Sequence, residues 1–297
     1  MPAPTWVITD IMPTGGLIGL YAPPGSYKSF LAMDFAMSIA TGLPWNGRVV
    51  EQGDGLYIAA EGGRGVGIRA GAWCLHKNVH PRKVPIAWLL EALPVYGDSE
   101  EIDTVFERLG NEVKKQPTFI VIDTLARCFD GNENEQEDMG RFIAGATRFQ
   151  KEFDATVMIV HHTRLDGDRE RGNTAFRGAA DTMISLAKQG DQGGVILSCN
   201  KQKDAEEFSM IGLRLRAVED TLSCVLVPAK GQQSNKIAKM DQMWRILEQN
   251  GPLSYGDWFD QLGSLVSSAT FKRLIDSLRL NGKIAKENGK YDVIKAQ

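Results

Sequence analysis

The chain has 297 residues, a length that allows one large α/β domain or one medium domain followed by a small one. Hydrophobic residues make up 43% of it and charged residues 24%, which are ordinary globular values and exclude a disordered or fibrous chain. No run of about 18 apolar residues is present, the four cysteines form no CxxC pair, and we expect no signal peptide, because the first residues lack a basic region and an apolar stretch. We therefore expect a reduced, cytoplasmic protein rather than a secreted, membrane-spanning or zinc-stapled one.

The net charge of -3 is unevenly distributed along the chain. Residues 236–297 contain ten Lys and Arg against seven Asp and Glu, whereas the preceding residues contain 24 against 30. A basic tail on an acidic body is typical of a small domain that contacts nucleic acid. Because a solvated surface often carries such an excess, the charge alone does not decide the partner.

The body of the chain alternates short apolar runs with helical stretches. Strands are expected at residues 16–21, 55–60, 119–122 and 156–160, and helices at residues 28–40, 99–116 and 136–153. Continuous apolar runs separated by helices indicate a mainly parallel sheet covered on both faces. Beyond Ala180, four strands follow with short turns, at residues 182–186, 195–199, 210–215 and 222–227, and we expect them to form an antiparallel extension.

A polar segment without periodicity, residues 228–235, is predicted to be a linker. Helices are expected after it at residues 237–249, 255–262 and 268–281, followed by a hairpin over residues 282–294 that turns at Asn288-Gly289. Three helices followed by a β-wing resemble a winged helix. The expected organisation is an α/β core over residues 1–228 and a winged-helix domain over residues 236–297.

A phosphate-binding loop is predicted between the first strand and the first helix. It consists of Ala22, Pro23, Pro24, Gly25, Ser26, Tyr27, Lys28 and Ser29. Such a loop needs backbone amides aimed at phosphates, a lysine for the outer phosphates and a hydroxyl for Mg²⁺, and Lys28 and Ser29 occupy the last two positions. The segment departs from GxxxxGK[ST] twice, because Ala22 and Tyr27 stand where that pattern has glycine. A side chain at Tyr27 is the more serious departure.

Three further polar positions follow the predicted strands at the same edge of the sheet. Asp123 ends the run 119–122, where a carboxylate can hold the water shell of Mg²⁺. Glu61 follows the second strand, where a carboxylate can orient or deprotonate an attacking water. His161 and His162 follow the fourth strand, where one imidazole can sense the γ-phosphate. Adjacent side chains on an extended segment point in opposite directions, so we expect only one of the two to do so.

Five segments, in chain order, are APPGSYKS, YIAAEGG, FIVIDTLAR, MIVHHTR and CNKQKD. Together they resemble the RecA/DnaB superfamily of P-loop ATPases, and within it the RepA-type hexameric helicases of plasmids and their phage-borne relatives. The resemblance covers residues 5–227 and implies a RecA-like core that forms a ring and holds ATP and Mg²⁺ between neighbouring subunits. The positions that match the family's phosphate, magnesium, catalytic and sensor residues are Lys28, Ser29, Glu61, Asp123 and His161.

The same resemblance implies a cation supplied in trans. The segment Lys201-Gln202-Lys203 is similar to the KQR segment of DnaB-like helicases, whose cations reach into the neighbour's site. A cation acting in this way contributes on the order of a thousandfold or more to hydrolysis. A basic turn after a strand is the alternative interpretation, and Arg177 is a rival for the trans role.

Two sets of basic residues are candidates for DNA contact. Residues 163–172 stand where RecA-like rings carry a channel-facing loop, and Arg164, Arg169 and Arg171 are expected to follow the phosphates of a single strand. Interleaved acids leave a solvated loop as the alternative. In the tail, the third helix presents basic residues as a recognition helix does, namely Lys272, Arg273 and Arg279. Winged helices also dock proteins, so the fold alone does not fix this partner.

These observations lead to the hypothesis of an ATP-hydrolysing, ring-forming motor on DNA, a helicase for plasmid or phage replication. Three alternatives remain open: a RecA-like recombination or strand-annealing ATPase, an ATP-switched DNA-binding regulator, and a helicase loader. The expected partners are single- and double-stranded DNA, further copies of the chain in a hexameric ring, and replication proteins.

Overall fold

The computed structural model describes residues 4–61, 63–95, 100–112, 116–129, 131–133, 135–162, 174–189, 193–229, 242–243, 246–247, 249–263, 266–280, 284–287 and 289–293. The chain divides into two compact units, Met1–Pro228 and Ala229–Gln297, each of which is described by itself. Among the described residues, no helix is both long enough and apolar enough to cross a membrane.

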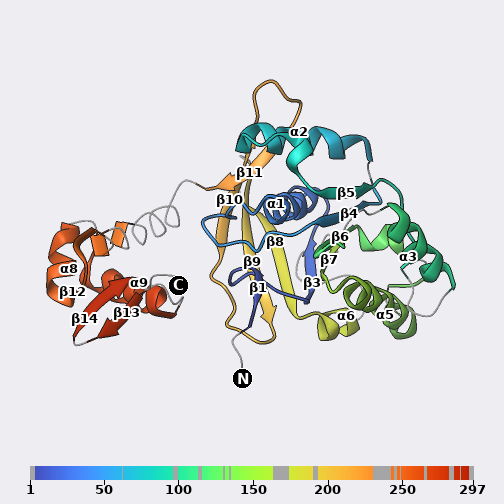
Figure 1. Cartoon of the computed structure of the whole chain (residues 1–297). Coiled ribbons are helices and arrows are strands. Elements are labelled where there is room, and N and C mark those ends of the chain that lie inside the picture. Colours follow the sequence, from blue (N-terminus) through green and yellow to red (C-terminus); the bar gives the residue numbers. More distant parts are fainter. Residues whose placement is uncertain are drawn as a thin grey trace. The chain divides into compact units, whose positions relative to one another are not determined.

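The first unit is built on a nine-stranded sheet of order β11-β10-β9-β8-β3-β7-β6-β4-β5 (Figure 1). Its strands are β3 (Leu17–Ala22), β4 (Gly55–Ala59), β5 (Ile86–Leu89), β6 (Phe119–Asp123), β7 (Thr156–His162), β8 (Thr182–Gln189), β9 (Gly194–Gln202), β10 (Ile211–Ala217) and β11 (Cys224–Pro228). The six strands from β8 to β5 are parallel, and β9, β10 and β11 continue the sheet in antiparallel register. A separate hairpin pairs β1 (Trp6–Ile8) with β2 (Met12–Pro13).

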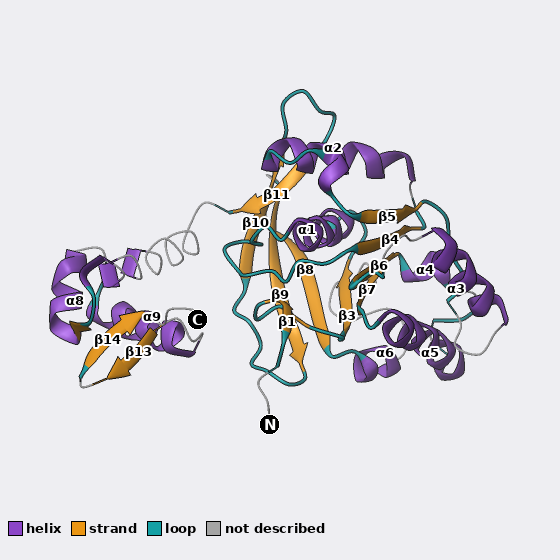
Figure 2. Ribbon diagram, viewed as in Figure 1, coloured by secondary structure: helices purple, strands orange, loops and turns teal. Residues whose placement is uncertain are grey.

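Helices cover both faces of this sheet, as Figure 2 shows. They are α1 (Lys28–Thr41), α2 (Gly63–Lys77), α3 (Glu100–Glu112), α4 (Leu125–Cys128), α5 (Gln136–Phe153) and α6 (Thr174–Ala179), with the 3-10 turn η1 (Pro81–Lys83) after α2. One hydrophobic cluster joins α1 and α2 to one face, and a second joins α3 and α5 to the other. Apolar residues of the central strands alternate between the two clusters, which explains their continuous apolar sequences.

Three of the departures from the sequence-based expectation concern β8, β5 and α2. β8 opens the segment expected to be antiparallel, yet it pairs with β3 in parallel, with Tyr21 opposite Ser185. β5 was not predicted, because it is a short edge strand with three half-buried residues. α2 was not predicted either; its glycines weaken the helical pattern, while Val66 and Trp73 anchor its inner face in the core.

The second unit has its own core, centred on Trp258 and Phe271. Residues 242–243, 246–247 and 249–250 are helical, and α8 (Tyr255–Leu262) and α9 (Ser268–Leu280) follow. A three-stranded antiparallel sheet of order β12-β14-β13 completes it, from β12 (Leu253–Ser254), β13 (Ile284–Glu287) and β14 (Lys290–Val293). Ser254 caps α8 by accepting a hydrogen bond from the Asp257 amide at 3.2 Å.

Candidate active site

The loop between β3 and α1 bends through two residues with left-handed backbone. Gly25 has φ 71° and Tyr27 has φ 67°. Glycine adopts this conformation freely, whereas a residue with a Cβ atom is strained by about 1–2 kcal/mol. Tyr27 therefore holds a conformation that the usual glycine would adopt without strain, and the departure seen in the sequence is structurally accommodated.

Lys28 begins α1 and turns its side chain back into the loop. Its ammonium donates to the carbonyl oxygens of Ala22 (2.8 Å) and Pro23 (3.0 Å) and to His162 Nδ1 (3.0 Å). Burial lowers the pKa of Lys28 to about 8, although the charges of Asp123 and Glu61 act to raise it. The loop thus holds a cation on neutral acceptors, ready for an anionic partner.

Asp123, at the end of β6, lies on the same face of the sheet as α1. Its Oδ2 accepts a 2.7 Å hydrogen bond from the Tyr57 hydroxyl, and its Oδ1 is buried without a hydrogen-bond partner among the described residues. Burial raises the pKa of Asp123, while hydrogen bonds from Tyr57 and Ser29 lower it. An unsatisfied carboxylate oxygen beside a serine hydroxyl matches the oxygen ligands that Mg²⁺ takes, so these residues fit that ion.

Glu61 lies two residues beyond β4 and is held by its neighbours. Its Oε1 accepts a 2.8 Å hydrogen bond from the Thr124 hydroxyl and lies 3.5 Å from His162 Nε2. An ammonium group only donates, so His162 Nδ1 accepts from Lys28 and the ring proton resides on Nε2, toward Glu61. The result is a chain of polar contacts from Lys28 through His162 to Glu61 and Thr124.

The histidine that takes part in these polar contacts is His162 rather than His161. Along β7, Val160 packs in the core cluster that includes α1, and Ile159 packs in the cluster on the opposite face. Strand alternation therefore places His162 on the α1 face and His161 on the other, where it lies 3.7 Å from Glu133. The expectation that only one of the pair faces the loop agrees with this geometry, but the residue there is not the one that the family resemblance implied.

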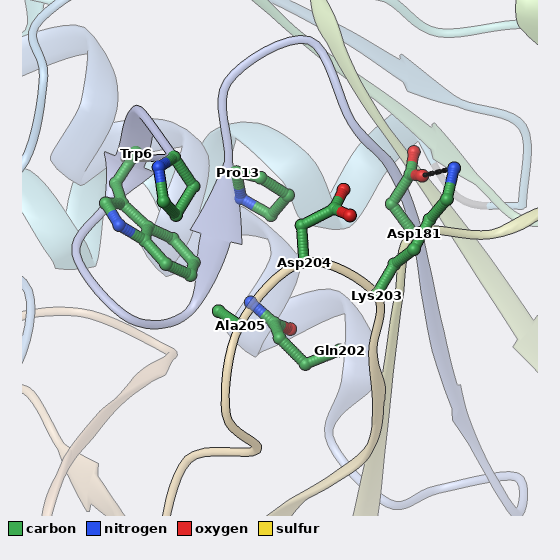
Figure 3. Close-up of a pocket in the computed structure, with 8 residues that line it drawn as sticks. Trp6, Pro13, Asp181, Gln202, Lys203, Asp204 and Ala205 are labelled. Atoms are coloured by element: carbon green, nitrogen blue, oxygen red, sulfur yellow. Dashed lines mark hydrogen bonds and ion pairs between the residues drawn. The ribbon is translucent and has the colours of Figure 1, made fainter. Parts of the chain in front are cut away.

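The basic residues expected to act in trans gather at the opposite edge of the sheet. Lys201 donates to the carbonyls of Arg177 (2.8 Å) and Gly178 (2.9 Å), and Arg177 donates to the Asn200 carbonyl (2.9 Å). Lys203 pairs with Asp181 at 3.2 Å, and both line a small pocket together with Trp6 and Pro13 (Figure 3).

Strand register shows how far this group lies from the chain's own loop. The Lys203 amide bonds to the Asp181 carbonyl, and the Asp181 amide bonds to the carbonyl of Leu17, at the start of β3. The phosphate-binding loop follows the other end of β3. The six residues of β3 therefore separate the basic cluster from the phosphate-binding loop by about 20 Å.

Some predicted residues cannot be placed. Arg164, Arg169 and Arg171 lie outside the described residues. Arg273 and Arg279 fall within α9, but their side chains are not described, whereas Lys272 is exposed there.

The residues missed from the sequence are Tyr57, Thr124 and Lys188, which contact Asp123, Glu61 and Tyr27, respectively. Alternation along β4 places Tyr57 on the α1 face, and this was the one available signal for any of them.

The geometry defines a P-loop nucleotide site at the carboxyl edge of a mainly parallel α/β sheet, a RecA-like arrangement. The sequence profile of the family described as "AAA domain" matches residues 1–168, more than half of the chain, so the chain belongs to that family. Membership implies an ATPase. No curated protein matches the chain.

Solved structures show the same fold. The crystal structure of the RadB recombinase aligns with a TM-score of 0.50 and 15% identity, covering 68% of this chain and 88% of that one. At this identity the likeness concerns the fold, and it agrees with a RecA-like core.

Proposed function

We propose that the protein is an ATP-hydrolysing RecA-like enzyme that acts on DNA as a homo-oligomer. The observation that carries the proposal is the convergence of Lys28, Glu61 and Asp123 at one sheet edge, with Glu61 oriented by Thr124 and His162. Single-stranded DNA should stimulate hydrolysis of ATP, and a turnover assay with and without an oligonucleotide tests this. Turnover that DNA leaves unchanged would argue against a DNA-dependent motor.

In the proposed reaction, each residue of the site has a separate role. Lys28 exchanges its carbonyl acceptors for the outer phosphates, and Glu61 takes a proton from the attacking water. Ser29 and Asp123 would hold Mg²⁺, which supplies charge neutralisation at the phosphates. His162 is placed to report the presence of the terminal phosphate, because it contacts both Lys28 and Glu61.

The position of Lys201, Lys203 and Arg177 supports the proposed oligomer. About 20 Å of strand separates this cluster from the chain's own loop, which supports a role at a neighbour's nucleotide rather than at the chain's own. In the proposed ring, the cations leave their present partners, the carbonyls and Asp181, for a phosphate of the next subunit. Arg177 lies within the same cluster, so the two candidates for the trans role need not exclude one another.

A mixing experiment tests the trans role. The Lys201→Ala, Lys203→Ala protein should bind ATP yet hydrolyse it poorly, and Glu61→Gln should do the same for a different reason. Mixed together, they should recover activity at interfaces that combine an intact Glu61 with intact lysines. If co-assembled mixtures stay inactive, the trans role moves to Arg177 or the ring is abandoned.

Recombination or strand annealing is the better supported activity on DNA. The likeness to a recombinase fold favours it, while the Lys201-Gln202-Lys203 segment favours a replicative helicase as second candidate. Strand displacement on a tailed duplex distinguishes the two: a helicase separates the strands with ATP alone, whereas a recombination ATPase anneals complementary strands, or exchanges a strand only when a homologous single strand is supplied. Imaging with ATP distinguishes hexameric rings from filaments.

The second unit is proposed to be a winged helix that contacts duplex DNA. Its order of helix, short strand, two helices and hairpin supports this assignment, and α9 stands where a recognition helix would. Lys272 on α9 and Lys286 on β13 are exposed cations suited to phosphates. Docking of a replication protein is the alternative for this unit.

A further inference from the structure

Lys188 is a cation at the phosphate-binding loop that neither the sequence motifs nor the family resemblance assigns. Ser185 of β8 pairs with Tyr21 of β3, so Lys188 stands three residues further on, level with Pro24. Ile184 and Leu186 pack in the core cluster that includes α1, so alternation turns Lys188 to the same face. The register thus places this lysine beside the loop, on the side that α1 occupies.

The ammonium of Lys188 lies over the loop itself. Its Nζ is 5.2 Å from the centre of the Tyr27 ring and 3.8 Å from the position that a Cβ atom would take on Gly25. The side chain is exposed, and the described residues offer it no carboxylate within ion-pair distance. A lysine that the described residues leave without an acidic partner, held on an aromatic face above an anion-binding loop, is suited to bind a phosphate.

The strand order indicates which part of a nucleotide this cation meets. β3 lies between β8 and β7, and Lys28, Glu61 and Asp123 converge on the β7 and β6 side. The terminal phosphate belongs on that side, because the catalytic carboxylate is there. Lys188 approaches from the β8 side and therefore faces the phosphates nearer the ribose.

Tyr27 explains how Lys188 is kept in place. Its ring contacts the Lys188 ammonium and also forms an edge-to-face pair with Phe30, at 6.3 Å between centroids. A strained backbone conformation is retained at a functional site when the side chain has a specific role there. We take the contact of the Tyr27 ring with the Lys188 ammonium, which keeps that group above the loop, to be this role.

We propose that Lys188 is a second nucleotide-binding lysine, acting within its own subunit on the inner phosphates and positioned by the Tyr27 ring. The proposal rests on the nucleotide site proposed above. Because ATP and ADP share these phosphates, the contribution is the same for both and appears in affinity rather than in the rate of the chemical step.

The test compares Lys188→Met, which keeps most of the length of the side chain and removes its charge, with Lys188→Arg and wild type. Calorimetric titration with ADP should show about tenfold weaker binding for Lys188→Met, near-normal binding for Lys188→Arg, and a difference that shrinks between about 0.05 M and 0.5 M salt. Lys83→Met is the matched control, since Lys83 is an exposed lysine preceding the amino end of β5, at the opposite sheet edge, and it should bind ADP normally.

The role of Tyr27 is tested in the same titrations. Tyr27→Phe keeps an aromatic face and should bind ADP as wild type does, whereas Tyr27→Leu should lose part of the affinity. Combining Tyr27→Leu with Lys188→Met should cost less than the sum of the single effects, because both act through one ammonium. Additive losses would overturn the positioning role.

Inorganic tripolyphosphate, used to displace a fluorescent ADP analogue, identifies the group that Lys188 contacts. The Lys188→Met protein should lose affinity for tripolyphosphate as it does for ADP. A loss for ADP alone would mean that Lys188 meets the ribose or base, and unchanged ADP binding would exclude any contact; either result overturns the inference. If wild type and Lys28→Ala alike fail to bind ADP, the proposed function falls as well.

Discussion

Lys28 is buried, and its ammonium rests on two carbonyl oxygens and one imidazole nitrogen rather than on a carboxylate. Burial lowers its pKa to about 8, so at that pH about half of the free protein has lost this proton, and the fraction rises further above it. A bound phosphate favours the charged ammonium and draws the proton back. Nucleotide binding and proton uptake are therefore linked through this residue.

The first prediction concerns this linkage. ADP affinity should fall by up to about tenfold per pH unit above about pH 8, because binding must then take up a proton. Calorimetry between about pH 7 and about pH 9.5, in buffers of different ionisation enthalpy, measures the uptake directly. His162→Asn should retain the uptake, which assigns it to the lysine. Constant affinity across this range would show that Lys28 keeps its proton throughout.

Tyr27 yields the second prediction. Tyr27→Gly should still hydrolyse ATP at saturating concentration, because glycine adopts φ 67° without strain and the amides and Lys28 stay in place. The relief of about 1 kcal/mol of backbone strain offsets part of the lost ring contacts in the free energy of unfolding. Steady-state kinetics measures the outcome. An inactive variant would give the ring a direct part in the reaction.

At the level of elements, the parallel core was predictable because each central strand is buried on both faces. The runs at β3, β4, β6 and β7 are continuously apolar, and the polar residues that end them mark the site. Placing Asp123 and Glu61 beside Lys28 needed only the rule that parallel strands end at one edge.

The features that the sequence did not predict depend on strand register and on which face of the sheet a side chain occupies, and a single sequence shows neither. The choice between His161 and His162 requires knowing which side of β7 meets α1. Lys188 was missed because the strand was expected to end at residue 186, and the next two residues, Ala187 and Lys188, are exposed and carry no apolar pattern. α2 is held by tertiary contacts of Trp73 rather than by helix propensity.

One of these contacts gives the third prediction. The buried carboxylate of Asp34, on α1, accepts a hydrogen bond on each oxygen: from Trp73 Nε1 on Oδ1 and from Trp45 Nε1 on Oδ2, both at 2.7 Å. Asp34→Asn has one acceptor oxygen, so one indole loses its partner, and the protein should be destabilised by about 1–3 kcal/mol. Chemical denaturation measures the change.

Trp73→Phe supplies the control for Asp34. It removes one of the two donors, so Asp34→Asn should cost clearly less in that background than in wild type. Equal costs in both backgrounds would mean that the paired hydrogen bonds do not hold α2 to α1.

At the scale of the whole molecule, the two units have separate hydrophobic cores. Truncation after Pro228 should therefore leave the first unit folded, with an unchanged thermal midpoint for that unit. This fourth prediction is checked by calorimetric unfolding of the full and truncated chains. A truncated chain that no longer unfolds cooperatively would show that the first unit depends on the second.

The truncated chain should also bind duplex DNA more weakly, and the loss should shrink as salt rises. Each phosphate contact removed lowers the salt slope by about 0.9. Charge reversal at Lys272 and Arg273 should reproduce most of this effect in the full chain. Equal DNA affinity for all three proteins at two salt concentrations would leave protein docking as the role of the second unit.

The central claim is that Lys28, Glu61 and Asp123 form an ATP-hydrolysing site, and the fifth prediction tests it through Glu61. The decisive measurement is ATP binding and single-turnover hydrolysis by wild type, Glu61→Gln and Lys28→Ala. Glu61→Gln should bind ATP as wild type does and hydrolyse it about 10²–10⁴-fold more slowly, because its amide cannot accept the water's proton. Lys28→Ala should neither bind nor hydrolyse ATP appreciably. Full turnover by Glu61→Gln, or normal turnover by Lys28→Ala, would contradict the account.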